Sequence, residues 1–176
     1  MPKATPMRIY LDTCVYLDLL TENQEPHKDT GEPRWKAAKA VLDAVNGDRV
    51  VLAASALVEA EVNCAAAVRD GTQAVAEQVR GWFIAESTDW TDVDRFLARE
   101  AAQLARAWHP FRANKKKRLG GADATHLAAA VRLRCDYLMS HDEAFPLGEK
   151  VEGVQVVRPG AVWPQDLLDD LDEMGR

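Results

Sequence analysis

The sequence predicts an α/β fold, a three-layer α/β/α sandwich with a central parallel sheet of four or five strands. Short apolar runs alternate along the chain with longer stretches of helical periodicity, a pattern typical of parallel strands joined by right-handed helical crossovers. The 176 residues are 47% hydrophobic, which is enough for one core of ordinary size without a disulfide or metal staple. Because no repeat and no linker interrupts the alternation, we expect a single domain over residues 1–176 that ends in an acidic tail.

The elements of the N-terminal part follow from where apolar runs meet polar residues, Pro or Gly. A strand is expected over 7–11 (MRIYL) and a short helix over 13–20. The segment 21–34 is polar and carries Pro and Gly, which is typical of a loop. A helix over about 34–46 should then end at Gly47.

The middle of the chain continues the alternation. A strand is expected over 49–53, and Ser55 should open a helix that runs to about Arg69. Another helix over 72–82 should lead into a strand near 83–87.

The C-terminal part begins with a long amphipathic helix that ends near Trp108 and that Asp89 or Thr91 could cap. The remaining expected elements are a basic, Gly-ended loop over 109–121, a helix over 122–134, strands over 137–140 and 154–157, and the acidic tail over 166–176.

The charge balance argues against a polycationic nucleic-acid binder. Lys and Arg number 22 against 28 Asp and Glu, so the net charge is -6, and a nucleic-acid partner must meet a local patch. A basic cluster that runs straight into the helix over 122–134 could hold the phosphates of an RNA strand; its members are Arg112, Lys115, Lys116, Lys117 and Arg118. A solvated surface loop explains the same run equally well.

The cysteines and the hydropathy pattern indicate a soluble, cytoplasmic protein. Cys14, Cys64 and Cys135 form no CxxC pair and lie in apolar helical stretches, so we expect buried free thiols that pack as small hydrophobes. The first ten residues hold no apolar run of the signal-peptide type. No stretch approaches the ~18 apolar residues that a membrane span requires, so we expect no membrane partner.

Three aspartates lie where strands are expected to join helices. Asp12 follows the first strand, Asp142 follows a later one, and Asp123 lies in the first turn of the helix after Gly120 and Gly121. Ligands of open parallel sheets bind beyond the carboxyl ends of the strands. Helix capping explains any one of these residues alone, but three at one edge of a sheet favour a site.

Glu61 adds a fourth carboxylate. On the helix opened by Ser55 it shares the spacing of a buried stripe with Leu57 and Ala65, whereas Glu59 lies on a solvated stripe. A buried, ionised carboxylate needs a partner or a metal, and no Lys or Arg occupies a neighbouring position on the stripe. The alternative places Glu61 at the margin of the stripe with its head in water.

The convergence of these four carboxylates would require cations. Two carboxylates ~4 Å apart repel by about 4 kcal/mol at an effective dielectric constant of ~20. Oxygen-only ligands select hard ions such as Mg²⁺ or Mn²⁺, and such an ion, with open positions for water and a phosphate oxygen, is suited to phosphodiester hydrolysis. Thr13 and Ser140 flank the predicted site, and their hydroxyls would either orient its carboxylates or cap helices.

Two histidines lie close to these residues in the sequence. His126 follows Asp123 by three positions and could face the site, although a structural role is the favoured interpretation. His141 precedes Asp142 and is expected to be exposed to solvent.

Four motifs in order along the chain carry a resemblance to a known family, and they read RIYLDT, SALVEAE, GGADATHLAAAV and YLMSHDEAF. The chain resembles the PIN-domain nucleases, most closely the VapC toxins of bacterial toxin–antitoxin pairs. Carried over position by position, the family pattern implies a metal-binding catalytic set formed by Asp12, Glu61, Asp123 and Asp142. The chain departs from the family at Cys14, where Asn is frequent, and in the longer loop over 21–34.

The resemblance implies a Mg²⁺- or Mn²⁺-dependent endoribonuclease that leaves a 5′-phosphate and a 3′-hydroxyl, a cognate antitoxin as inhibitor, and a homodimer. Other interpretations remain open at this point. They are a housekeeping RNA-processing nuclease of the same fold without an antitoxin, a catalytically inactive PIN-like binding protein, and a phospho-accepting receiver module. The receiver module fits least, because such modules present paired acids after the first strand, whereas Thr13 and Cys14 follow Asp12.

Overall fold

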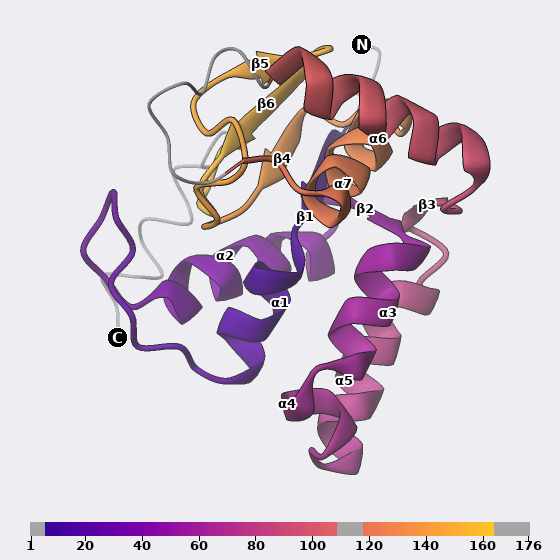
Figure 1. Cartoon of the computed structure of the whole chain (residues 1–176). Coiled ribbons are helices and arrows are strands. Elements are labelled where there is room, and N and C mark those ends of the chain that lie inside the picture. Colours follow the sequence, from indigo (N-terminus) through magenta and orange to yellow (C-terminus); the bar gives the residue numbers. More distant parts are fainter. Residues whose placement is uncertain (1–5, 109–117, 164–176) are drawn as a thin grey trace, which may run out of the picture.

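The structure, a computed structural model, describes residues 6–108 and 118–163 and contains one mixed sheet of six strands (Figure 1). The strands are β1 (Met7–Leu11), β2 (Val50–Ser55), β3 (Asp89–Thr91), β4 (Tyr137–Met139), β5 (Lys150–Val151) and β6 (Val154–Val157). Their order in the sheet is β3-β2-β1-β4-β6-β5. The first two strands in the chain therefore lie side by side, β1 and β4 occupy the centre, and the later strands add on both sides.

All strand pairs are parallel except β5 with β6. This arrangement confirms the predicted α/β fold class with a largely parallel sheet. The sheet has six strands in the described residues, not four or five, because the sequence analysis missed β5. That strand is only two residues long and forms a tight antiparallel pair with β6, so it leaves no periodic signal in the sequence.

Helices cover both faces of the sheet (Figure 1). They are α1 (Thr13–Leu20), α2 (Arg34–Asn46), α3 (Ala56–Cys64), α4 (Ala66–Arg69), α5 (Gln73–Ile84), α6 (Arg95–Trp108) and α7 (Gly121–Arg132). α6 and α7 pack together on one face, whereas α1 and α2 pack together on the other. The helices α3, α4 and α5 extend beyond the end of the sheet as a separate group.

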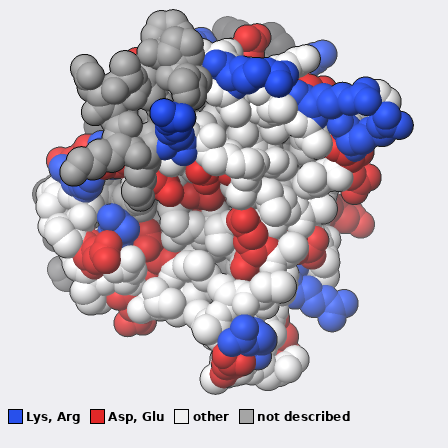
Figure 2. All heavy atoms as spheres, viewed as in Figure 1, with Lys and Arg blue, Asp and Glu red and all other residues white. Residues whose placement is uncertain are grey.

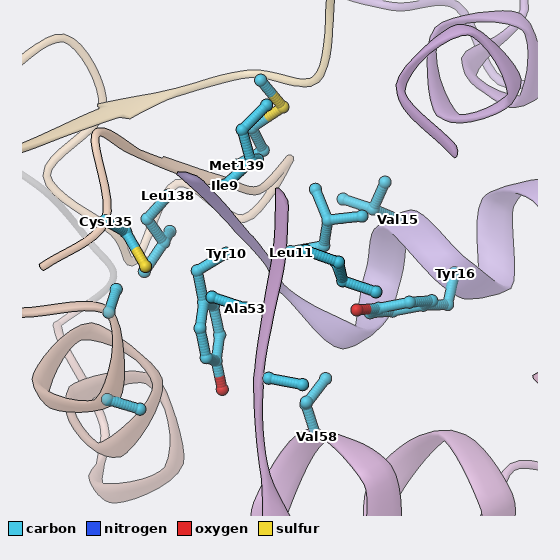
Figure 3. Packing of buried hydrophobic residues seen from close by; sticks show 14 of the residues in the cluster. Ile9, Tyr10, Leu11, Val15, Tyr16, Ala53, Val58, Cys135, Leu138 and Met139 are labelled. Atoms are coloured by element: carbon cyan, nitrogen blue, oxygen red, sulfur yellow. The ribbon is translucent and has the colours of Figure 1, made fainter. Parts of the chain in front are cut away.

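The central strand β1 directs its side chains to both faces in turn. Figure 3 shows Tyr10 on one side of β1, with Leu11 and the α1 residues Val15 and Tyr16 on the other. All four side chains are fully buried, as expected for a strand covered on both faces. Tyr10 is thereby directed towards α7, which places a hydroxyl group inside the core near the carboxyl end of the sheet.

The helix expected from Ser55 to Arg69 is broken in two. Ser55 caps α3 as predicted, through a hydrogen bond from Val58 N to its Oγ. Ala65 then adopts an extended conformation (φ -63°, ψ 142°), which ends α3 and begins α4. A single Ala carries no sequence signal for such a break, because its helix propensity is the highest of all residues.

The prediction of a strand near 83–87 was wrong. α5 continues to Ile84 because Val79, Trp82 and Phe83 form one buried helical face, and the third strand is β3 at Asp89–Thr91. β3 was mistaken for a capping segment of the next helix. The residue that caps α6 is instead Asp94, whose Oδ1 accepts a hydrogen bond from Leu97 N at 2.7 Å.

Two further predictions concern the cysteines and the membrane. Cys135 is buried and Cys14 is partly buried, but Cys64 is exposed at the end of α3, so its prediction as a buried residue was wrong. Cys64 lies two positions after Val62, and this spacing places it on the side of α3 opposite the buried stripe of Val58 and Val62. No helix within the described ranges is long and apolar enough to cross a bilayer.

Candidate metal centre

Asp12 lies at the junction of β1 and α1. Its backbone is extended (φ -68°, ψ 155°), and its Oδ1 accepts a hydrogen bond from Thr13 N at 2.8 Å, so it caps α1. Its Oδ2 accepts a hydrogen bond from Ser140 Oγ at 2.7 Å. Asp12 therefore fits both predicted roles, as a helix cap and as a residue of the site. One carboxylate oxygen caps α1, and the other contacts Ser140 just after β4.

Ser140 connects Asp12 to Asp142. Its Oγ donates to Asp12 and accepts a hydrogen bond from Asp142 N at 2.9 Å. The Oδ1 atom of Asp142 accepts a hydrogen bond from Ala144 N at 2.8 Å. The expected orienting role of Ser140 thus has a geometric basis, since one fully buried hydroxyl contacts both segments that carry these acids.

Glu61 lies on the side of α3 that meets α1 and α7. Its Oε2 accepts hydrogen bonds from Thr13 Oγ1 and, at 2.9 Å, from His126 Nε2. The hydrogen bond from His126 is the main cause that lowers the pKa of Glu61 below its usual range, and the one from Thr13 lowers it further. These contacts keep Glu61 ionised and bring Thr13 between the first two predicted carboxylates.

The predicted burial of Glu61 needs correction. The buried stripe of α3 consists of Val58 and Val62, whereas Glu61 lies at its margin with 32% of its side chain exposed. The stripe drawn through Leu57 was displaced by one position. The carboxylate therefore has protein partners already and does not require a metal to satisfy it.

Asp123 lies in the first turn of α7, where Gly120 N donates a hydrogen bond to its Oδ2 at 3.3 Å. Burial raises the pKa of Asp123 above its usual value, and the negative charges of Asp142 and Asp12 raise it further. The three aspartates are thus close enough to repel one another. With Glu61, the structure brings all four predicted acids to the same edge of the sheet.

His141, a neighbour of this edge, differs from expectation. His141 is only 6% exposed, so its prediction as a solvent-exposed residue was wrong. Its Nε2 lies 3.4 Å from Asp18 Oδ2, and its ring packs edge-on against His27. Burial lowers the pKa of His141 to about 4, which keeps the imidazole neutral. A sequence pattern cannot show this, because the loop over 21–34 supplies the covering residue His27.

Cys14 occupies the position where the resembled family often has Asn. Its Sγ lies 3.7 Å from Ser140 Oγ and accepts a contact from His141 N at 3.5 Å. Burial is the main cause that raises the pKa of this thiol well above its usual value, followed by the charge of Asp12. The side chain therefore packs beside the acids as a neutral thiol.

The sequence analysis missed Tyr10 and Ser55 as neighbours of the site. The Tyr10 hydroxyl lies 2.7 Å from Ser55 Oγ and 2.9 Å from His126 Nδ1, and all three residues are buried. A usable signal existed in the sequence, since a Tyr hydroxyl on a strand covered on both faces needs a hydrogen-bond partner.

The donor set fits a hard divalent cation. Four carboxylates supply only oxygen atoms. Burial raises the pKa of Asp123, the charges of Asp142 and Asp12 raise it further, and a bound cation would relieve both effects. Within the described ranges, no three or more His, Cys, Asp or Glu side chains are already arranged to hold an ion. Joint coordination therefore requires some of these side chains to rotate from the hydrogen-bonded positions given above.

Charged side chains are unevenly distributed over one face of the molecule. Figure 2 shows Asp and Glu side chains together near the middle of one face, with Lys and Arg mainly towards its rim. Of the predicted RNA-binding cluster, Arg118 is exposed just before α7. The other members, Arg112, Lys115, Lys116 and Lys117, lie outside the described residues.

Comparisons with known proteins agree on one family. Residues 9–149 match the family described as PIN domain. A chain of a toxin–antitoxin complex from Klebsiella pneumoniae is 19% identical, with a TM-score of 0.55 over 88% of this chain and 99% of that one. The Mycobacterium tuberculosis toxin VapC20, which cleaves the sarcin–ricin loop, is 20% identical, with a TM-score of 0.54 over 86% and 99%.

A third similar structure is FitAcB from Neisseria gonorrhoeae, which is 19% identical, with a TM-score of 0.52 over 86% of this chain and 97% of that one. No curated protein sequence matches the chain. At these identities the structural likeness establishes the shared fold over nearly the whole length of each neighbour.

Proposed function

Since the chain belongs to the PIN-domain family, we propose that it is a metal-dependent endoribonuclease that hydrolyses RNA phosphodiester bonds, and that it is the toxin of a VapBC-type pair. The observation that carries the proposal is the gathering of four carboxylates at one edge of the sheet, where burial, and beyond it the charges of Asp142 and Asp12, raise the pKa of Asp123. Such a cluster is suited to a divalent cation and, through it, to phosphodiester chemistry.

The four acids would hold Mg²⁺ or Mn²⁺, which when bound supplies charge to stabilise the leaving oxygen and to activate water. In this proposal, Asp12, Glu61, Asp123 and Asp142 are the ligands. Thr13 donates to Glu61 and Ser140 donates to Asp12, so each hydroxyl restricts the orientation of one ligand. Cleavage leaves a 5′-phosphate and a 3′-hydroxyl.

In the proposal, the basic cluster of residues 112–118 binds the phosphates of the RNA. Arg118 is exposed directly before α7, the helix that carries Asp123. Positive charge at this place would offset the net charge of -6 and would bind phosphates in a salt-dependent way.

The remaining parts of the proposal are a cytoplasmic location, a homodimer and a cognate antitoxin. Support for the antitoxin comes from the similar chain in the Klebsiella pneumoniae toxin–antitoxin complex. The product of a short reading frame adjacent to the gene should co-purify with this chain and inhibit it. A housekeeping nuclease would have no such inhibitor.

The test of the nuclease assignment uses labelled total RNA. The purified protein should cleave it with Mg²⁺ or Mn²⁺ and should not cleave it with EDTA. Asp12→Asn and Asp123→Asn should each abolish cleavage while the circular dichroism spectrum is retained. Asp43→Asn is the matched control, because Asp43 is an exposed carboxylate on α2 that pairs with Lys39.

The control variant should cleave at the wild-type rate. Full activity in either site variant, or cleavage that persists in EDTA, would contradict the assignment.

A further inference from the structure

A chain of buried hydrogen bonds runs from the centre of the sheet to Glu61. It passes from Ser55 at the end of β2 to Tyr10 on β1 at 2.7 Å, and from Tyr10 to His126 on α7 at 2.9 Å. It then passes from His126 Nε2 to Glu61 Oε2 on α3 at 2.9 Å. Ser55, Tyr10 and His126 are at most 1% exposed, so water does not compete for the two contacts that Tyr10 makes, whereas the contact to Glu61 is partly buried.

The direction of the hydrogen bonds follows from the end members. Glu61 is ionised and can only accept, so His126 Nε2 carries a hydrogen and donates it. Burial is the main cause that raises the pKa of Tyr10 well above its usual value, so its hydroxyl keeps its proton. In a neutral imidazole, Nδ1 then accepts from Tyr10, whose oxygen accepts in turn from Ser55.

Ser55, Tyr10 and His126 therefore each donate one hydrogen bond to the next group in this chain. The core of the sheet sets the tautomer of His126, and His126 presents an N–H to the carboxylate. A histidine ring exposed to solvent would rotate freely. The ring of His126 is held in one orientation by its hydrogen bond and ring contact with Tyr10. Metal-binding sites commonly hold their ligands by such outer contacts.

The two oxygens of Glu61 are not equivalent. Both hydrogen bonds, from Thr13 Oγ1 and from His126 Nε2, reach Oε2. Within the described ranges no hydrogen bond to Oε1 is found. His126 Nε2 also lies 3.8 Å from Asp12 Oδ1, so the imidazole lies between two of the proposed ligands.

We propose that His126 is a positioning residue of the metal centre: with Thr13 it holds Oε2 of Glu61 and so reserves Oε1 for a divalent cation. This inference rests on the proposed function, because it assumes that Glu61 is a ligand. His126 itself contacts neither the RNA nor the cation. Its effect is to select one orientation of Glu61 before the cation binds, which removes the entropy cost of ordering that side chain during binding.

The test measures Mn²⁺ binding by calorimetry on the full-length protein without RNA. His126→Leu should weaken Mn²⁺ binding by roughly 10–100-fold, the range found when outer-shell partners are removed. His126→Gln should recover most of the affinity, because its side-chain amide can donate to Oε2 from a similar distance. His27→Gln is the control, since His27 is a comparably buried histidine that donates to Pro159 O and does not contact Glu61.

The control outcomes separate this inference from the proposed function. If the wild-type protein does not bind Mn²⁺, the proposed metal-dependent function fails, and this inference fails with it. If the wild-type protein binds Mn²⁺ and Asp12→Asn abolishes binding, the metal centre stands. Wild-type affinity in His126→Leu, or equal losses in His126→Leu and His27→Gln, would then overturn the positioning role alone.

A second readout needs no metal and no loss of the imidazole. Nitrogen-15 NMR of the histidine rings should show His126 as the tautomer with hydrogen on Nε2 at neutral pH. Tyr10→Phe keeps the ring in place but removes the donor to Nδ1, so the resonances should shift towards a mixture of tautomers. A wild-type spectrum with hydrogen on Nδ1, or an unchanged spectrum in Tyr10→Phe, would contradict the proposed chain.

Discussion

Individual residues near the metal centre combine structural and chemical roles. Asp12 caps α1 with one oxygen and accepts a hydrogen bond from Ser140 with the other. His126 is a core residue by burial and a partner of Glu61 by its hydrogen bond. A capping or core role therefore does not exclude a role in the proposed metal centre for these residues. A site at the end of a buried sheet is built from groups that also hold the fold.

His141 leads to a prediction about acid stability. Burial lowers its pKa in the folded state to about 4, whereas a histidine in the unfolded chain titrates near 6.5. Between these pH values the unfolded state binds more protons, so the free energy of unfolding should fall as the pH drops from about 6.5 to about 4. The loss should be at most about 3 kcal/mol, and urea unfolding across this range measures it.

The comparison variant is His141→Phe, which keeps a buried ring but cannot take up a proton. Its stability should change less with pH in the same window. The other charged groups that face His141 are Asp18, His27, Asp29, Arg34 and Arg158. Burial raises the pKa of Asp18, so this residue makes the free energy of unfolding rise as the pH falls, opposite to the effect of His141. Both proteins contain Asp18 and share this contribution. Equal slopes in the two proteins would contradict the prediction.

Helix starts position the site at the scale of the elements. α1 begins directly after β1, α3 begins directly after β2, and α7 carries Asp123 in its first turn. The positive end of a helix dipole favours a carboxylate, so at Asp123 it offsets part of the cost of burial that raises the pKa of this residue. α7 in turn packs against α6, which makes the position of Asp123 depend on that helix pair.

Asp94 joins α6 to α7 and provides a test of this dependence. It caps α6 through Leu97 N, and its carboxylate contacts Arg132 on α7 at 3.2 Å. Asp94→Ala removes both interactions, so the melting temperature should fall by a few degrees. Asp43→Ala, which removes an exposed carboxylate in a pair on α2, should change it less. Calorimetric melting curves measure the difference, and equal values for the two variants would exclude a special role for Asp94.

At the scale of the whole molecule, the fold concentrates negative charge that is distant in the sequence. The four acids come from the ends of β1 and β4 and from the helices α3 and α7. Burial is the main cause that raises the pKa of Asp123, and the charges of Asp142 and Asp12 raise it further, so this ionised carboxylate is a cost of folding in the absence of a cation. A chain with a net charge of -6 offers few long-range positive charges to offset it.

Divalent cations should therefore stabilise the folded protein. At a free Mn²⁺ concentration 100 times the dissociation constant, the gain should be about 2.7 kcal/mol, which corresponds to a rise in melting temperature of roughly 5–10 °C for a domain of this size. Differential scanning fluorimetry with Mn²⁺ and with EDTA measures the rise. Asp123→Asn should melt higher than wild type in EDTA and should gain less from Mn²⁺; an equal gain in both proteins would contradict a shared cation site.

Much of this protein is determined by local sequence. The periodicity of the apolar residues predicts the α/β class, Ser55 predicts the start of α3, and the motifs around residues 12, 61, 123 and 142 predict the acids as a set. These features depend on neighbours within a few residues, because hydrogen bonds within helices and the alternation of strands are local. Tertiary structure alone decided that α5 runs past residue 82, that His141 is buried against Asp18 and His27, and that Tyr10 reaches His126. Each of those outcomes depends on contacts between segments far apart in the chain, whose approach is set by packing around the whole sheet.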